Sequence, residues 1–189
     1  KAFDAKSGEL LWARTSENLK HLAPLSLSAI EKKAFYMDNE KIFCVDLKTG
    51  KDIWQAPFGT TGLFMRNYAP TLVVSEEVIV CVSDEQMAAY DVKDGKKLWG
   101  KDQGFYGFAS PADLFIIGDL VWTGHTCKGD LKDILGIDLK TGEVKRSFSE
   151  KQILPGGHHH RCYRNRATER YLIMGRRGVE FVDLMGDEH

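Results

Sequence analysis

Short apolar runs, separated by Gly, Pro, Asn, Asp and Ser, follow one another at even spacing along the chain. Runs of this kind predict β-strands and an all-β fold, because strand side chains point alternately to two faces. The expected strands are residues 24–28, 33–37, 41–46 and 51–54, then 70–75, 78–82, 87–91 and 97–99, then 111–117, 120–124, 134–138 and 143–148. A last set starts near Arg161 and continues through 170–174 and 178–183.

The runs belong to an internal repeat, in which an apolar pair precedes an Asp, a polar turn with Gly, and a segment that ends in Trp. Clear copies occupy residues 2–12, 43–54 and 89–99, and weaker copies occupy 136–146 and 181–187. The anchoring aspartates, Asp4, Asp46, Asp91, Asp138 and Asp183, are 42, 45, 47 and 45 residues apart. This period is typical of one four-stranded propeller blade per repeat.

The repeated residues are expected to have structural roles. The Asp carboxylates can accept hydrogen bonds from the amides of their own turns. Four turn glycines are expected at positive φ, which Gly adopts without Cβ strain: Gly8, Gly50, Gly95 and Gly142. Three indoles offer apolar area for packing against a neighbouring blade: Trp12, Trp54 and Trp99.

Composition narrows the class of protein. Hydrophobic residues make up 43% and charged residues 28% of the 189 residues, which is ordinary for a globular protein. The net charge of −1 predicts no nucleic-acid partner. No apolar run approaches the ~20 residues that a membrane-spanning helix needs. The cysteines lie one to a repeat without a C-x-x-C pair: Cys44, Cys81, Cys127 and Cys162. Cys44 and Cys81 are expected to be small buried hydrophobes.

The pattern A-x-D-x-x-T-G-x-x-x-W, preceded by Ala23-Pro24, Ala69-Pro70 or Ser110-Pro111, resembles the PQQ-like β-propeller repeat. That family includes pyrroloquinoline quinone dehydrogenases and outer-membrane assembly lipoproteins. The resemblance implies a partial propeller of about four four-stranded antiparallel blades. The expected blades of this single domain, residues 1–189, are 1–12 (partial), 23–54, 68–99, 109–148 and 158–189 (partial).

Because the quinoprotein propellers of that family are eight-bladed, we expect the chain to be part of a larger ring. An open arc exposes strand edges and apolar blade faces. The expected partners are therefore the remaining blades of a parent propeller or a second copy of the chain.

The fourth repeat departs from the others where its innermost strand begins. Counting back from Asp183 places His158, His159 and His160 in the loop before that strand, with Cys162, Arg164 and Arg166 along it. Cys162 and Arg164 stand where the first full repeat has Leu25 and Leu27, which we expect to be apolar core. Such a local exception in a regular repeat is where function is expected.

Two functional hypotheses compete for this segment, beside a simple solvated channel wall. In the first, a zinc or copper ion is bound by His158, His159, His160 and Cys162, joined by His125 and Cys127 of the preceding repeat. In the second, a carboxylate, a phosphate or PQQ is bound by Arg161, Arg164, Arg166, Arg176 and Arg177. The sequence does not decide between a metal ion and an anionic ligand or PQQ as the bound group.

The sequence favours a non-catalytic binding or scaffold module of an extracytoplasmic bacterial protein. The alternative is part of a PQQ-dependent dehydrogenase. The resemblance to those enzymes implies a Cys-Cys pair and a carboxylate ligand set for Ca²⁺, which the sequence lacks. Asp113 is the best lone carboxylate, expected to face the channel and be hydrated.

Overall fold

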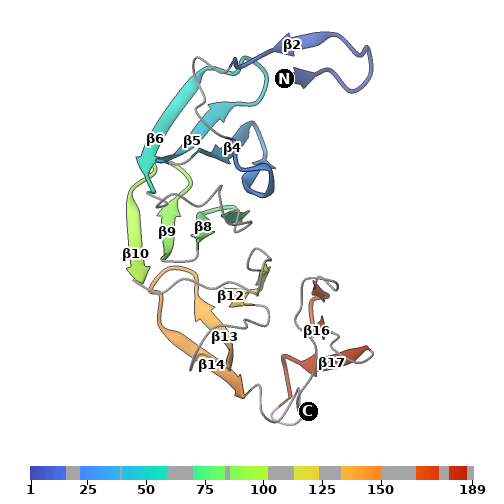
Figure 1. Cartoon of the computed structure of the whole chain (residues 1–189), viewed down its shortest axis with the longest axis vertical. Helices are drawn as coiled ribbons and strands as arrows, with labels where there is room; N and C mark the ends of the chain where they lie inside the picture. The colour runs from blue at the N-terminus through green and yellow to red at the C-terminus, as the bar shows by residue number, and fades with distance from the viewer. Residues whose placement is uncertain are drawn as a thin grey trace.

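The computed structural model describes residues 1–15, 22–38, 40–58, 70–83, 86–101, 113–123, 133–149, 165–174 and 179–186. In these residues it contains seventeen strands and one 3₁₀ helix. The sheets stand side by side along an arc (Figure 1), with the N-terminal hairpin at one end and the last sheet at the other. The expected all-β, partial β-propeller of about four blades is confirmed.

The N-terminal hairpin consists of β1 (Ala2–Phe3) and β2 (Leu10–Trp12). Blade 1 consists of β3 (Ser28–Ile30), β4 (Lys33–Met37), β5 (Lys41–Asp46) and β6 (Asp52–Pro57). Blade 2 consists of β7 (Thr71–Val74), β8 (Val78–Val82), β9 (Met87–Asp91) and β10 (Lys97–Lys101). Blade 3 consists of β11 (Leu114–Ile117), β12 (Leu120–Thr123), β13 (Asp133–Asp138) and β14 (Val144–Ser149). Blade 4 consists of β15 (Arg166–Ala167), β16 (Tyr171–Met174) and β17 (Glu180–Asp183).

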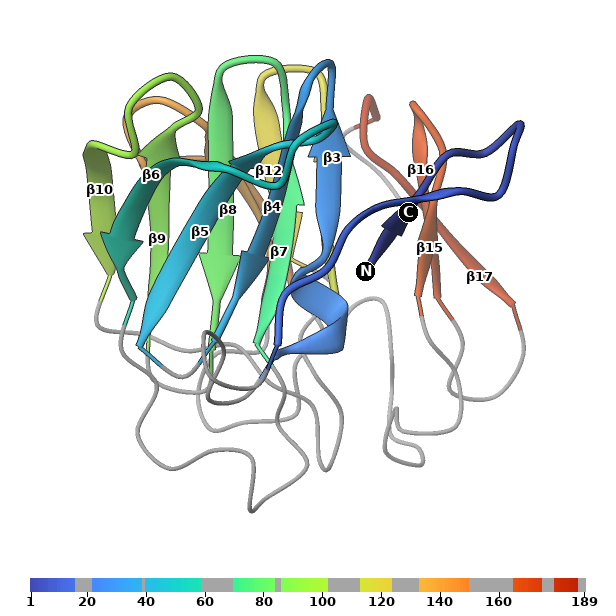
Figure 2. The same cartoon turned by 90° about the horizontal axis from the view of Figure 1, so that it is seen from above.

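Strands that follow one another along the chain pair antiparallel within each sheet. The fourth strands β6, β10 and β14 lie along the convex side of the arc (Figure 1). Figure 2 shows the strands of neighbouring blades side by side, with the described hairpin turns gathered at one end. This arrangement leaves the first strands of the blades on the concave side.

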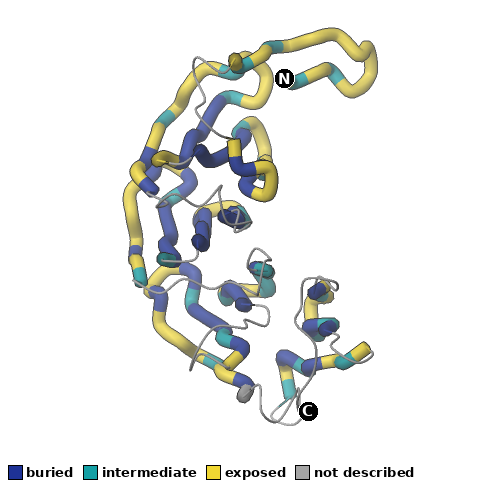
Figure 3. The backbone as a smooth tube through the Cα atoms, viewed as in Figure 1, coloured by how far each residue is buried: buried dark blue, intermediate teal, exposed yellow. Residues whose placement is uncertain are grey.

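The hydrophobic core lies between the blades, where buried residues of neighbouring sheets pack in shared clusters. Figure 3 shows the buried stretches in the middle of the sheets and mostly exposed residues along the convex side of the arc. In β8, Ile79 and Cys81 pack in the cluster shared with blade 1, whereas Val78, Val80 and Val82 pack in the cluster shared with blade 3. Successive side chains reach opposite faces because of the pleat. An interior blade is therefore apolar on both faces, and each such side chain contributes roughly 1.5–3 kcal/mol when fully buried.

Each fourth strand carries a long side chain that contacts the next blade. The contact is made with the turn that joins the third and fourth strands of that next blade, or follows its third strand. In three cases an indole N–H donates to a backbone carbonyl: Trp12 to Leu47 at 2.9 Å, Trp54 to Val92 at 3.1 Å and Trp99 to Leu139 at 2.8 Å. Each accepting residue directly follows an anchoring aspartate. The expectation that the tryptophans pack against a neighbouring blade is confirmed. We call this the tryptophan–turn contact.

The glycines of the same turns lie against these indoles. They have positive φ, as expected: Gly50 at 69°, Gly95 at 74° and Gly142 at 74°. A Cβ built on each would approach an indole carbon to 2.6 Å at Gly50, 2.5 Å at Gly95 and 2.7 Å at Gly142. Two separate requirements therefore select glycine here, namely the left-handed backbone and the close approach of the ring.

The anchoring aspartates organise the turns as expected. The Asp46 carboxylate accepts hydrogen bonds from the backbone N–H of Lys48 at 3.1 Å and of Thr49 at 2.7 Å, and from the Thr49 hydroxyl at 2.8 Å. Asp4 and Asp138 make the same set of contacts. Donation by the Thr49 hydroxyl and amide lowers the pKa of Asp46. The contacts within the turn thus stabilise its ionised form.

The expected first strand at 24–28 is wrong. Pro24–Ser26 form a 3₁₀ helix, and the strand begins at Ser28. The Ser26 hydroxyl, buried, accepts from the Met37 N–H at 2.7 Å and donates to the Ala23 carbonyl at 2.7 Å. This tertiary pairing of Ser26 replaces ladder hydrogen bonds, so the segment has no need to be extended.

The expectation that Leu25 and Leu27 lie in the apolar core is also wrong. Leu25 is 40% exposed and Leu27 is 65% exposed, because both lie in or just after the 3₁₀ helix. The exchange of these leucines for Cys162 and Arg164 in the fourth repeat is therefore not an exchange of core for polar residues.

Replacing Gly95 by Ala is expected to destabilise the chain more than replacing Gly118. Both have positive φ, 74° and 60°, but a Cβ on Gly118 meets nothing within 4 Å. Gly118→Ala should cost about 1 kcal/mol for the backbone alone. Gly95→Ala should cost a further ~1–3 kcal/mol, because the new methyl overpacks the Trp54 ring. Urea unfolding measures both, and equal losses would contradict the role assigned to the ring.

Candidate functional site

The concave side of the arc carries a groove of about 1020 Å³. It is lined by the first strands and the residues next to them: Ser28, Ala29, Val73, Val74, Leu114, Phe115, Ile116, Ile117, Gly118, Ala167, Thr168, Glu169 and Met185. In a closed propeller this surface faces the central channel. We call it the hub groove.

Most of the residues that line the hub groove have apolar side chains, and of its described lining residues only Glu169 is charged. Each first strand is also the end strand of its sheet, so within the described residues its inner edge has no ladder partner. Such an edge presents a row of backbone N–H and C=O groups. The groove therefore combines apolar surface with backbone donors and acceptors.

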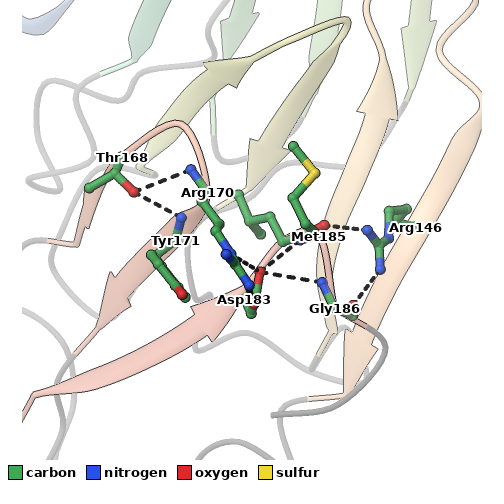
Figure 4. A network of polar contacts seen from close by, with 8 residues as sticks. Arg146, Thr168, Arg170, Tyr171, Asp183, Met185 and Gly186 are labelled. Atoms are coloured by element: carbon green, nitrogen blue, oxygen red, sulfur yellow. Dashed lines mark hydrogen bonds and ion pairs between the residues drawn. The ribbon is translucent and has the colours of Figure 1, made fainter.

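The boundary between blades 3 and 4 differs chemically from the others. Arg146 takes the place of the tryptophan on β14, and its guanidinium donates to the carbonyl oxygens of Leu184 and Gly186, the latter at 2.6 Å (Figure 4). Its guanidinium carbon also lies 5.3 Å from the centre of the Phe148 ring. The accepting Leu184 again follows an anchoring aspartate, Asp183. A cation thus replaces the indole while the carbonyl partner is kept.

Within the described residues, Asp183 is the anchoring aspartate that forms an ion pair with an arginine. Arg170 donates from Nε to Asp183 Oδ1 at 3.1 Å and from Nη2 to Oδ2 at 2.7 Å (Figure 4). The backbone N–H groups of Met185 and Gly186 donate to the same carboxylate at 3.0 and 3.3 Å. The Arg170 hydrogen bonds, followed by the Met185 amide, lower the pKa of Asp183 to about 2.

Asp113 joins blades 3 and 4. Its Oδ2 accepts a hydrogen bond from the backbone N–H of Asn165 at 3.0 Å. Asn165, only 7% exposed, directly precedes β15. The carboxylate that we expected to be simply hydrated therefore positions the start of the innermost strand of blade 4.

Of the predicted site residues, the structure describes Arg166. It is exposed on β15 and pairs in register with Ile173 of β16. The others lie outside the described residues: His125, Cys127, His158, His159, His160, Arg161, Cys162, Arg164, Arg176 and Arg177. The metal site and the anion site therefore stay predictions.

Sequence reasoning missed Arg146 and Asn165. Arg146 had a visible signal, because it stands at the position of the repeated tryptophan. Asn165 had none, because its contact with Asp113 joins residues that are 52 positions apart.

Among the described residues, no group of three or more His, Cys, Asp or Glu is arranged to hold a metal ion. Cys44 and Cys81 are buried free thiols, as expected. Burial raises the pKa of Cys44 to about 11 and that of Cys81 well above its ordinary value. Both thiols are therefore protonated at neutral pH and suited to packing rather than to metal binding.

Comparison with known families places the chain. A model of the PQQ repeat family, described as "Outer membrane protein assembly factor BamB", matches residues 1–148. The match covers well over half of the chain, which therefore belongs to this family of PQQ-like repeat proteins. No curated protein matches the chain.

Solved structures share the fold. BamB from Moraxella catarrhalis aligns with a TM-score of 0.61 and 14% identity, over 89% of this chain and 48% of that chain. The computationally designed protein Ika8 aligns with a TM-score of 0.55 and 14% identity, over 85% of this chain and 45% of that one. A europium-containing methanol dehydrogenase aligns at a TM-score of 0.49 and 15% identity, over 66% and 24% of the two chains, which is too slight to bear on function.

The chain thus spans less than half the length of the propellers it resembles, and the likeness at these identities shows the fold alone. In the described part of the chain, no helix has the length and apolarity to cross a membrane.

Replacing Asp183 by Asn is expected to flatten the acid dependence of stability. Pairing with Arg170 lowers the pKa of Asp183 from its ordinary value of 3.8 to about 2, so the ionised carboxylate stabilises the fold at any pH above the pKa of the unfolded chain. That contribution is lost as the pH falls from about 5 towards 2. Urea midpoints across this range should fall more steeply for the wild type than for Asp183→Asn. Parallel curves for the two proteins would contradict the assignment.

Proposed function

We propose that the chain is a non-catalytic binding or scaffold sector of a larger PQQ-like propeller, with the hub groove as its ligand surface. The observation that carries this proposal is the chemistry of the groove, in which apolar side chains flank strand edges without a ladder partner in the described residues. An extended peptide can pair with such an edge and place alternate side chains on the apolar wall.

The setting of the protein is part of the same proposal. Membership of a family described by an outer-membrane assembly factor supports a location outside the cytoplasm of a bacterium. The coverage of less than half of the propellers it resembles supports the need for further blades as partners. The hub groove is then half of a channel that the other blades complete.

Ala29 is the position at which to test the groove, because it is exposed and lines it. A fluorescein-labelled peptide of alternating Val and Thr should bind the wild-type chain, as measured by anisotropy. Ala29→Arg should weaken this binding about tenfold, because a guanidinium replaces apolar contact.

The matched control is Leu98→Arg, on the outer strand β10 at a residue 38% exposed, which should bind the peptide like the wild type. Failure of the wild-type chain to bind would remove the proposal. A redox-active quinone absorbance after addition of PQQ and Ca²⁺ would instead favour the dehydrogenase alternative.

The segment from His158 to Cys162 carries a separate prediction. If these residues bind zinc or copper, the purified chain should contain about one metal ion per molecule. The double variant His160→Ala, Cys162→Ala should contain none, because the loss of two ligands strongly weakens a four-ligand site. Elemental analysis by mass spectrometry measures this. Unchanged metal content in the double variant would exclude these ligands and leave the anion hypothesis for the arginines.

A further inference from the structure

A second cavity adjoins the hub groove at the end of the arc where the described hairpin turns gather (Figure 2). It has a volume of about 540 Å³ and lies between blades 2 and 3, each of which has all four strands. Its walls are the turn between β7 and β8, the turn between β11 and β12, and the turn that follows β13. We call it the turn pocket. Gly118 lines both spaces, so the hub groove and the turn pocket meet at this residue.

The passage over Gly118 is not blocked by a neighbouring side chain. A Cβ built on this glycine would meet no atom within 4 Å. Residues on both sides of the passage come from the same turn, because Ile117 lines the hub groove and Asp119 lines the turn pocket. A ligand that lies in the groove can therefore extend a side chain past Gly118 into the pocket.

The turn pocket has an excess of negative charge. Its charged lining residues are four carboxylates and one ammonium group: Glu76, Glu77, Asp119, Asp138 and Lys140. Lys140 Nζ lies 2.5 Å from Glu77 Oε2. The hydrogen bond and charge of Glu77, followed by the charges of Asp119 and Asp138, raise the pKa of Lys140. The carboxylates thus stabilise a positive charge at the one place where the chain supplies it.

Two of the four carboxylates have no counter-ion in the part of the chain that the structure describes. Asp138 accepts hydrogen bonds within its own turn, and Glu77 pairs with Lys140. Glu76 and Asp119 are exposed and belong to none of the ion pairs among the described residues. A second cation that enters the pocket therefore meets two carboxylates without breaking an existing pair.

The charge excess belongs to this pocket and not to the whole end of the arc. Another cavity, of about 430 Å³, also borders the turn between β7 and β8. Its charged lining residues are three carboxylates and three lysines: Glu76, Glu77, Asp91, Lys33, Lys93 and Lys140. Charges are balanced there, so of these two cavities the turn pocket is the one whose electrostatics favour a cation.

We propose that the turn pocket binds the basic side chain of a peptide whose apolar, extended segment lies in the hub groove, so that the site selects apolar segments that end in lysine or arginine. The inference deepens the proposed function and rests on it. The strand edges and the apolar wall take the segment, and Glu76 and Asp119 take the cation. Lysine and arginine suit this path, because their stems lie on apolar surface while the charged head stays in a wet, polar place.

The ion pairs in the turn pocket are expected to give selectivity more than affinity. Glu76 and Asp119 are exposed, and charge pairs at exposed sites add little binding free energy. A like charge at the same place is repelled, so the site discriminates between a basic and an acidic end of the peptide.

Competition between three peptides tests this selectivity. Each peptide has the same alternating Val and Thr core with blocked termini, and carries Lys, Gln or Glu at both ends. Each displaces the fluorescein-labelled Val–Thr peptide from the 189-residue chain, as measured by anisotropy. The Lys-ended peptide should bind about tenfold more tightly than the Glu-ended one at low salt, with the Gln-ended peptide between them. This ratio should fall as salt is added, because screening weakens exposed charge pairs.

The double variant Glu76→Gln, Asp119→Asn should reduce the ratio to about twofold or less, because both uncompensated carboxylates are lost. The Gln-ended peptide has no charge for the pocket, so its binding reports whether the hub groove of the variant is intact. Glu31→Gln is the matched control and should keep the tenfold ratio. Glu31 is exposed in the turn between β3 and β4, the equivalent place in blade 1, and lines neither the hub groove nor the turn pocket.

Equal binding of the Lys-ended and Glu-ended peptides to the wild-type chain would overturn the inference. A loss of preference in Glu31→Gln as large as that in the double variant would overturn it as well, because the effect would then come from the overall charge. In both cases binding of the Gln-ended peptide leaves the proposed function standing. A wild-type chain that binds none of the three peptides removes the proposed function and the inference together.

Discussion

The contact between a tryptophan and the turn of the next blade is the constraint on which the rest of the structure depends. The residue after each anchoring aspartate serves two blades at once: the Leu47 N–H donates within blade 1 to Lys32, and its carbonyl accepts from Trp12 of the hairpin. The geometry of one blade therefore fixes the position of its neighbour. Because Gly50 must also leave space for the indole, turn and side chain are specified together.

The boundary between blades 3 and 4 shows how this contact tolerates a change of chemistry. Arg146 replaces the indole by a guanidinium and keeps the carbonyl of Leu184 as acceptor. The Arg170–Asp183 pair then fixes the turn that presents this carbonyl. Polar interactions thus join the two blades at this boundary, as the tryptophans do at the others. The boundary lies beside the repeat that carries the predicted histidine and arginine site.

The hub groove follows from the same construction. Stacking blades in an arc puts first strands on the concave side, which creates this groove. In the same arc, the face of blade 4 that points away from blade 3 exposes Val179 and Phe181.

The sequence by itself determined the repeat, the turns that follow the anchoring aspartates and the all-β class. Asp46 and Gly50 act within a few residues of each other, so their spacing alone specifies the turn. Only the tertiary structure decided that Ser26 turns the expected strand into a 3₁₀ helix, and that Asp113 bonds Asn165, since these partners are 11 and 52 residues apart. Short-range hydrogen bonds can be read from spacing, whereas contacts between strands and blades exist only once the sheets are stacked.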